Sequence, residues 1–199
     1  TQSKDGFMWF GTQHGLNRFD GKKIVPINFI KTSNSTAGEY SGMITAMYID
    51  KRDNFWIGTT AEIFLFDRFT NKIFNATEKY RGLKIGNTSW IECIQEDNFG
   101  NLMIHTRGAL YLYNFSEEKL IDITTIELKN NVVSISISNY DKKTYIATEN
   151  EIYSYDGITF TTLSVRTFLT KRNTTIKKIL VIEDELWMIT TDNNVWISN

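Results

Sequence analysis

Short apolar runs of five to seven residues alternate along the chain with turn-forming residues. Between positions 44 and 76 the runs are "ITAMYID", "FWIGT", "IFLFD" and "KIFNA", and segments such as "KRDN", "TAE" and "RFTN" separate them. Runs of this length, rich in β-branched and aromatic residues, predict strands, and no run keeps a helical period over ten or more residues. The pattern predicts a chain of β-strands joined by tight turns.

This four-strand layout recurs at a regular interval. The repeats can be aligned on a large apolar residue three positions before a threonine, and the five aligned threonines, at positions 12, 59, 106, 148 and 190, are 42 to 47 residues apart. A period of 40 to 50 residues with four strands per unit is typical of β-propeller blades. We therefore predict an all-β fold, a β-propeller fragment of about five four-stranded antiparallel blades.

The blade repeats are expected at about 5–29, 44–76, 90–123, 132–163 and 176–198, within one propeller segment that covers residues 1–199. The first repeat supplies only its second, third and fourth strands, and the last repeat only its first, second and third. Both end blades are therefore expected to be incomplete, with eighteen strands in all. An incomplete blade leaves open strand edges, which can pair with another chain.

The recurring large residues are predicted to form the core between blades. A strand inside a propeller packs on both faces, so it needs one large apolar residue and a small residue where blades approach closely. Gly11, Gly58 and Ala147 are the expected small residues. The expected inter-blade core residues are Trp9, Trp56, Met103, Tyr145 and Trp187.

Charge and composition remove several function classes. Lys and Arg number 22 against 23 Asp and Glu, so no net charge favours binding to nucleic acid or an anionic membrane. No run approaches the eighteen apolar residues that span a bilayer. Cys93 is expected to be a small buried residue, and His14 and His105 lack a third ligand at a fixed spacing. We expect neither a metal nor a cofactor.

The first repeat, "DGFMWFGTQHGLNRFDG", resembles the two-component regulator propeller repeat, and "RDNFWIGTTAEIFLFDR" repeats it in altered form. From Gly100 onward the likeness weakens to the strand pattern. The residues that carry it are Asp5, Gly6, Trp9, Gly11, Thr12, Gly15, Leu16, Arg18, Phe19 and Gly21, then Asp53, Phe55, Trp56, Gly58, Thr59, Phe66 and Asp67.

The resemblance implies a place in the periplasmic sensor region of a hybrid two-component histidine kinase of gut Bacteroidetes. The resemblance implies a receptor with two seven-bladed propellers, followed by a β-sandwich, a membrane helix, kinase and receiver domains and an AraC-type DNA-binding domain. Such receptors sense oligosaccharides released from complex glycans. The implied partners are an oligosaccharide, the remaining blades of the receptor and, with open edges, a second copy of the chain.

A ligand site is expected in the loops that join the second to the third strand and the fourth strand to the next blade, because these share one face of a propeller. Sugar sites combine aromatic rings with planar polar groups. The ligand-binding candidates are Arg81, Trp90 and Arg107, with Tyr40 and His14. Trp90 could equally pack at a seam between blades, and the two arginines could be solvated or brace turns.

Two other functions remain open. The carboxylates Glu62, Glu149 and Asp192 occupy similar loop positions and could pair as acid and base in a propeller glycosidase or lyase. Nothing around them indicates a raised pKa, so we predict that the chain is not an enzyme. The second alternative is a structural or dimerising propeller without a ligand of its own.

Overall fold

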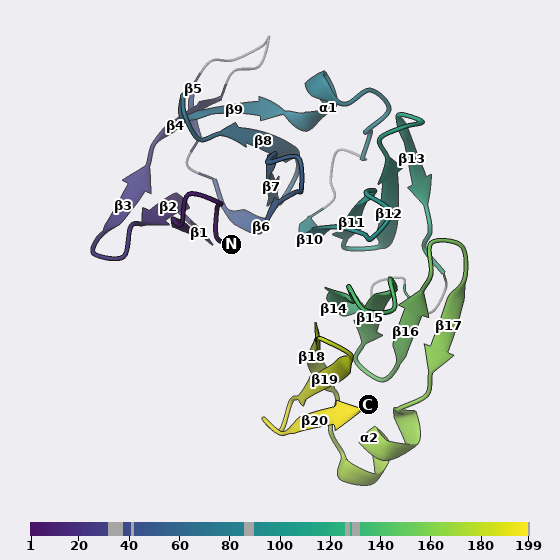
Figure 1. Cartoon of the computed structure of the whole chain (residues 1–199). Helices are drawn as coiled ribbons and strands as arrows, with labels where there is room; N and C mark the ends of the chain where they lie inside the picture. Colours follow the sequence, from purple (N-terminus) through teal and green to yellow (C-terminus); the bar gives the residue numbers. More distant parts are fainter. Residues whose placement is uncertain (32–37, 41, 86–89, 126–127, 129–131, 199) are drawn as a thin grey trace. The chain divides into compact units, whose positions relative to one another are not determined.

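The computed structural model describes residues 1–31, 38–40, 42–85, 90–125, 128 and 132–198, with the side chains of 29–31, 38–40 and 198 outside the description. The described strands form five sheets (Figure 1), and residue contacts divide the chain into two compact units. One unit contains Thr1–Glu96 and Leu102–Ile123, and the other contains Asp97–Asn101 and Thr124–Asn199.

The first sheet has the order β1–β2–β3. Gln2 forms an isolated antiparallel bridge to Met8, and the Trp9 N–H donates to the Thr1 carbonyl at 2.8 Å. Residues before β1 thus make backbone contacts with this strand that the sequence pattern did not predict. The strands are β1 (Met8–Thr12), β2 (Gly15–Phe19) and β3 (Ile24–Ile27).

The second sheet has six strands in the order β5–β4–β9–β8–β7–β6. Its four predicted strands are present, but the connection before β6 adds a hairpin, β4–β5, whose first strand pairs in parallel with β9 (Figure 1). The helix α1 follows β9. The elements are β4 (Phe29–Lys31), β5 (Gly38–Tyr40), β6 (Ile44–Ile49), β7 (Phe55–Thr59), β8 (Ile63–Asp67), β9 (Lys72–Asn75) and α1 (Ala76–Lys79).

The remaining sheets follow the predicted order, each strand beside the one before it. The third sheet contains β10 (Ile91–Glu96), β11 (Leu102–Thr106), β12 (Ala109–Asn114) and β13 (Lys119–Asp122). The second unit holds β14 (Val132–Ile137), β15 (Thr144–Thr148), β16 (Ile152–Tyr155), β17 (Phe160–Leu163), α2 (Arg166–Arg172), β18 (Ile176–Ile182), β19 (Glu185–Thr190) and β20 (Val195–Ser198).

The recurring threonine ends the second strand of every repeat and closes the turn that follows. The Thr59 hydroxyl donates to the Glu62 carbonyl at 2.9 Å and accepts the N–H groups of Ala61 and Glu62. A hydroxyl can fill both roles at once, which explains why the period is marked by this residue type. The matching hydroxyls of the other repeats donate to the carbonyls of Gly15, Ala109, Glu151 and Asn194.

Replacing Thr59 with valine, which keeps the shape and removes the hydroxyl, is expected to lower the free energy of unfolding by about 2 kcal/mol. The loss comes from the N–H groups of Ala61 and Glu62, which lose their acceptor, and from the Glu62 carbonyl, which keeps only the Thr59 backbone N–H. Urea unfolding followed by circular dichroism measures it. Thr59→Ser keeps the hydroxyl and should retain most of the stability; equal losses in both variants would contradict the role assigned to the turn.

Glycines set the spacing between sheets in the first unit. A Cβ atom added at Gly11 would lie 2.5 Å from the Ile44 Cγ2 atom, and one added at Gly58 would lie 2.5 Å from the Ile91 Cγ2 atom. Ile44, at the start of β6, and Ile91, at the start of β10, thus each lie directly on a glycine of the preceding sheet. This observation agrees with the role predicted for Gly11 and Gly58.

Aromatic residues fill the rest of these seams. Trp9, with 2% of its surface exposed, contacts Phe55 edge-on at 5.3 Å between ring centroids. Trp56 is fully buried, and its ring stacks on Tyr80 at 5.1 Å with an angle of 24° between the planes. Tyr80 follows α1, so this helix directs an aromatic ring into the second seam.

Aspartates hold the turn between β6 and β7 and the turn between β10 and β11. The Asp50 carboxylate accepts the Asn54 backbone and side-chain N–H groups, each at 2.8 Å, and the Trp56 Nε1–H at 2.9 Å. Asp97 accepts the same pair of groups from Asn101. These polar turns therefore fix the position of the strand that carries the large core residue.

The other predicted core residues lie at different depths. Met103 is fully buried, whereas Tyr145 and Trp187 are half-buried. Tyr145 packs with Ala147, Ile176 and Met188 in the core of the second unit and donates its hydroxyl to Asp141 at 2.8 Å. The Trp187 Nε1–H donates to the Glu185 carboxylate at 3.0 Å.

Candidate functional site

Two of the predicted ligand-binding residues lie together at one end of the third sheet. Trp90 precedes β10 and Arg107 follows β11, and pairing of Ile91 with Thr106 brings the two flanking residues to the same end. The Arg107 N–H donates to the Trp90 carbonyl at 3.1 Å, and the Arg107 guanidinium carbon lies 3.8 Å from the centre of the Trp90 ring. The antiparallel register thus builds a stacked cation–aromatic pair.

The carboxylate of Glu92, in β10, holds the Arg107 side chain. The Arg107 Nε–H donates to Glu92 Oε1 at 3.1 Å, while the second Glu92 oxygen lies 3.4 Å from His105 Nδ1. Stacking on Trp90 and the ion pair with Glu92 fix the position of the Arg107 side chain, of which 60% remains exposed. A guanidinium held this way can donate two parallel hydrogen bonds to a planar acceptor or to neighbouring hydroxyls.

His105 is buried beside this cluster. Burial lowers the pKa of the imidazole below its ordinary value of 6.5, and the Glu92 carboxylate opposes that shift. Burial likewise raises the pKa of the neighbouring Cys93 thiol to about 12, with Glu92 adding to the shift. A neutral thiol is a poor nucleophile, so this strand pair offers binding groups and no activated nucleophile.

Lowering the pH from 7 to 5 is expected to destabilise the protein. The folded state keeps His105 neutral, so the unfolded chain binds more protons below about pH 6.5 and stability falls as the pH falls, by at most about 1.4 kcal/mol per pH unit for one group. Thermal unfolding across this range in the protein and in His105→Gln measures it. The variant should show a smaller slope, and an unchanged slope would contradict the assignment.

Arg81 lies elsewhere. Its carbonyl accepts the Tyr113 hydroxyl at 2.5 Å, and a Cβ atom added at the next residue, Gly82, would clash with the Glu118 carbonyl oxygen. Glu118 belongs to the turn between β12 and β13, at the opposite end of the third sheet from Arg107. The structure therefore separates Arg81 from Trp90 and Arg107. The connection that contains α1 and Tyr80 passes the Glu118 end of the third sheet before it reaches Trp90 at the other end.

His14 and Tyr40 add no described side-chain contact to the cluster. His14 is exposed in the turn between β1 and β2, where its backbone N–H donates to the Thr12 hydroxyl at 3.1 Å. The backbone of Tyr40 ends β5, and its side chain lies outside the described residues.

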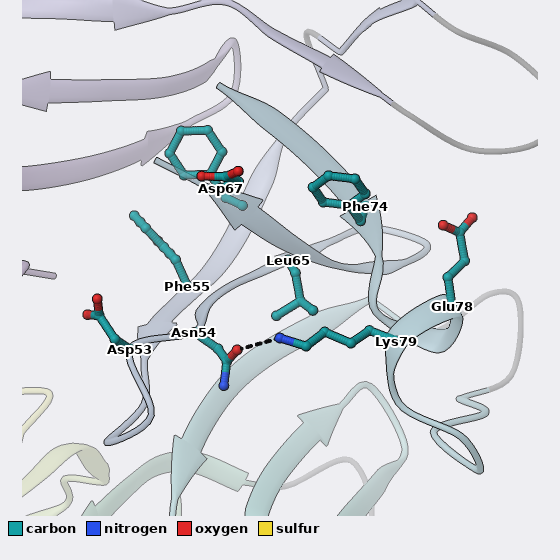
Figure 2. A pocket seen from close by; sticks show the side chains of 9 residues that line it. Asp53, Asn54, Phe55, Leu65, Asp67, Phe74, Glu78 and Lys79 are labelled. Atoms are coloured by element: carbon teal, nitrogen blue, oxygen red, sulfur yellow. Dashed lines mark hydrogen bonds between the residues drawn. The ribbon is translucent and has the colours of Figure 1, made fainter. Parts of the chain in front are cut away.

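A pocket of 510 Å³ lies on the second sheet beside α1, and the sequence reasoning did not find it. Figure 2 shows Lys79 reaching from α1 toward Asn54, to which it donates a hydrogen bond of 2.9 Å. The pattern gave no signal for Lys79, since α1 has only four residues. The pocket is lined by Asp53, Asn54, Phe55, Leu65, Phe66, Asp67, Phe74, Glu78 and Lys79.

The carboxylates of this pocket have structural partners. Asp53 pairs with Arg68 at 2.5 Å, and Asp67 accepts the Thr70 hydroxyl at 2.7 Å and the Phe69 N–H at 2.9 Å. The Thr70 hydroxyl is the main cause that lowers the pKa of Asp67. The pocket thus combines apolar walls with charged side chains, and two of its carboxylates, Asp53 and Asp67, already bond to neighbouring residues.

Of the three residues considered for catalysis, Glu62 and Asp192 bond through their carboxylates and Glu149 through its backbone. Glu62 accepts a hydrogen bond from the Asn75 amide at 3.2 Å, and the Glu149 carbonyl accepts the Ile176 N–H at 2.8 Å. The Thr190 hydroxyl, followed by Asn194, lowers the pKa of Asp192 to about 2. A carboxylate this acidic is a poor general acid.

Two searches of the described residues bear on metals and membranes. No group of three His, Cys, Asp or Glu residues in the described ranges is arranged to hold a metal ion. Within the same part of the chain, no helix has the length and apolar character that crossing a bilayer requires.

Comparison with known proteins gives a family match over one repeat. The model of the two component regulator propeller matches residues 41–61, the segment that contains β6 and β7. No curated protein shows a significant match to the sequence. The matched family is a regulator family, in agreement with the prediction that this chain is not an enzyme.

Solved structures share the fold at low sequence identity. The extracellular domain of a candidate one component system from B. thetaiotaomicron is 18% identical, with a TM-score of 0.68; the alignment covers 96% of this chain and 26% of that one. The extracellular domain of a candidate hybrid two component system from the same organism is 19% identical, with a TM-score of 0.56; the alignment covers 100% of this chain and 33% of that one. A catalytically inactive virginiamycin B lyase from Staphylococcus aureus is 14% identical, with a TM-score of 0.67; the alignment covers 99% of this chain and 67% of that one.

These likenesses bear on the architecture. This chain spans between a quarter and a third of the two extracellular domains, and at such identities both they and the lyase inform on the fold alone. Five successive sheets, antiparallel except for the β4–β9 pair and with three strands in the first and last, confirm the predicted fold class. The chain is a fragment of a β-propeller, and its residues 41–61 match the two component regulator propeller.

Proposed function

We propose that this chain is a ligand-sensing propeller segment of the periplasmic part of a hybrid two-component receptor. The observation that carries the proposal is the regulator propeller repeat at residues 41–61. The extracellular domains among the structural neighbours support it through their fold, and the receptor's other blades and a cytoplasmic histidine kinase are its partners in signalling.

The proposed ligand is an oligosaccharide derived from a glycan, bound beside Trp90 and Arg107. The exposed, pre-positioned guanidinium donates to sugar hydroxyls or to a sugar carboxylate, and Glu92 accepts from hydroxyls. The free edge of the half-buried Trp90 ring offers apolar contact to sugar C–H groups. Because stacking and the ion pair already hold Arg107, binding orders few additional rotamers.

Thermal unfolding in the presence of a panel of neutral and acidic oligosaccharides tests this proposal. One sugar is expected to raise the melting temperature in proportion to RT ln(1 + [L]/Kd), without release of a product. Trp90→Ala and Arg107→Ala should each abolish the shift. Arg81→Ala is the matched control, since this exposed arginine lies at the other end of the sheet, and it should leave the shift unchanged.

Three outcomes would count against the proposal. A shift that survives both site variants would place the ligand elsewhere. Turnover of the sugar would make the chain an enzyme. A panel without any shift would favour the structural alternative, in which the segment serves assembly alone.

A further inference from the structure

The pocket beside α1 has an apolar floor. Leu65 in β8 and Phe74 in β9 pair directly across the two strands, so their side chains lie next to each other on one face of the second sheet. Leu65 is buried and Phe74 is half-buried. The volume of 510 Å³ lies within the usual range of small-molecule sites, about 300 to 1,000 Å³. The floor therefore offers contact to the apolar part of a small ligand.

The helix α1 forms one side of this pocket and is anchored at both ends. Before the helix, the Asn75 side chain accepts a backbone N–H of the first turn at 3.0 Å. After it, the Tyr80 ring stacks on the buried Trp56. The two charged residues that α1 brings to the pocket, Glu78 and Lys79, are therefore held at fixed backbone positions (Figure 2).

The Lys79 side chain extends from α1 to the turn before β7. Its ammonium group donates to the Asn54 side-chain oxygen at 2.9 Å and lies 5.2 Å from the centre of the Tyr80 ring. Asn54 is held in turn by the Asp50 carboxylate, which accepts its side-chain N–H at 2.8 Å. Within the described residues no carboxylate pairs with Lys79, so its charge and its other two N–H groups can serve an anion.

Carboxylates supply the opposite charge. Glu78 is exposed and makes no hydrogen bond or ion pair within the part of the chain that the structure describes. Asp67 is ionised near neutral pH, since the Thr70 hydroxyl lowers the pKa of its carboxyl group further below the ordinary value of 3.8. The charge of Asp53 is already offset by Arg68.

The charges around the pocket balance each other. Lys72 does not line the pocket, but it pairs with Asp67 in the strand register and partly offsets its charge. Lys79 and Glu78, one of each sign, are therefore the lining charges that lack an offsetting neighbour in the described ranges. A simple anion would face the carboxylates and a simple cation would face the ammonium group, whereas a ligand that carries both charges meets both groups favourably.

We propose that this pocket binds a small zwitterion with an apolar side chain, of the class of free α-amino acids such as phenylalanine. The ligand carboxylate accepts hydrogen bonds from Lys79, the ligand ammonium group donates to Glu78, and the ligand side chain lies on Leu65 and Phe74. The pocket is separate from the sugar site proposed above, which lies on the third sheet, so the two proposals stand or fall independently.

Titration of the whole isotope-labelled chain with L-phenylalanine, followed by nuclear magnetic resonance, tests the proposal. A dissociation constant of about 1 mM is expected, and the signals of Leu65 and Phe74 should shift. Three analogues each lack one feature of the ligand. N-acetylphenylalanine lacks the ammonium group, phenethylamine lacks the carboxylate and glycine lacks the apolar side chain, and each should bind at least about fivefold more weakly.

Two charge variants assign the contacts. Lys79→Gln should weaken the binding of phenylalanine about fivefold without weakening that of phenethylamine, which has no carboxylate. Glu78→Gln should weaken the binding of phenylalanine and phenethylamine but not that of N-acetylphenylalanine. Both positions are exposed and glutamine suits a helix, so both variants should fold. Glu117→Gln removes a charge from the exposed turn between β12 and β13 and is the control, which should bind as the unmodified chain does.

Each alternative result overturns the proposal. A chain that does not bind phenylalanine at concentrations up to about 20 mM has no such site. Equal affinity for phenylalanine and glycine would show that the apolar floor is not used. Binding that is unchanged in Lys79→Gln and Glu78→Gln would place the amino acid elsewhere on the chain. An equal loss for phenylalanine and all three analogues in both variants would show that the two charges do not recognise the ligand.

Discussion

Replacing Trp56 with alanine is expected to lower the free energy of unfolding of the first unit by about 4 kcal/mol. The indole is fully buried, stacks on Tyr80, and donates its N–H to the Asp50 carboxylate. Its removal leaves a cavity in the seam between the second and third sheets and takes one partner from a carboxylate that is buried in a turn. Urea unfolding followed by far-ultraviolet circular dichroism measures the change.

Trp187→Ala is the matched control for this variant. Trp187 holds the same position in the last repeat, but its side chain is half-buried and bonds to Glu185. Its replacement is expected to cost about 1 to 2 kcal/mol. Equal losses in the two variants would show that burial in a seam is not what makes Trp56 important.

Replacing Gly58 with valine is expected to lower the free energy of unfolding by about 3 kcal/mol. Valine favours strands, so the residue itself suits β7, and the cost comes from the contact with the Ile91 side chain at 2.5 Å. The third sheet must move away from the second to admit the extra atoms. Chemical unfolding again measures the loss, and Ala61→Val in the exposed turn after β7 should be nearly neutral.

A double variant isolates the cause of the Gly58 effect. Ile91→Ala removes the Cγ2 atom, the nearest of those that valine would meet, although it also costs stability because Ile91 is 1% exposed. If the close approach is the cause, Gly58→Val with Ile91→Ala should be more stable than the two separate losses predict, by about 1 kcal/mol or more. Strict additivity would contradict the steric explanation.

The strand order was predictable because the signals for it are local. Alternating apolar residues, turn formers and the repeated threonine are all contained within one repeat, and the strands from β6 to β20 follow them. The β4–β5 hairpin was missed because β4 pairs with β9, some forty residues away, and no local pattern encodes a parallel contact. The helices α1 and α2 have four and seven residues, too few to show a helical period.

The candidate site was predictable only where it depends on paired strands. Trp90 and Arg107 flank two paired strands, so the predicted hairpin alone brings them together. Arg81 lies in the connection that contains α1, and its position depends on where that helix directs the chain. The pocket beside Lys79 depends on the same helix, and for that reason neither placement followed from the strand pattern.

The close fit between Gly58 and Ile91 also has a consequence for biosynthesis. Chains emerge from the ribosome with the N-terminal residues first, so β7 is complete well before Ile91 has been added. During that interval the apolar surface around Gly58 and Trp56 has no partner and is exposed to water. We expect nascent chains that end shortly before residue 91 to bind chaperones or aggregate, and chains that include the third sheet to escape this fate.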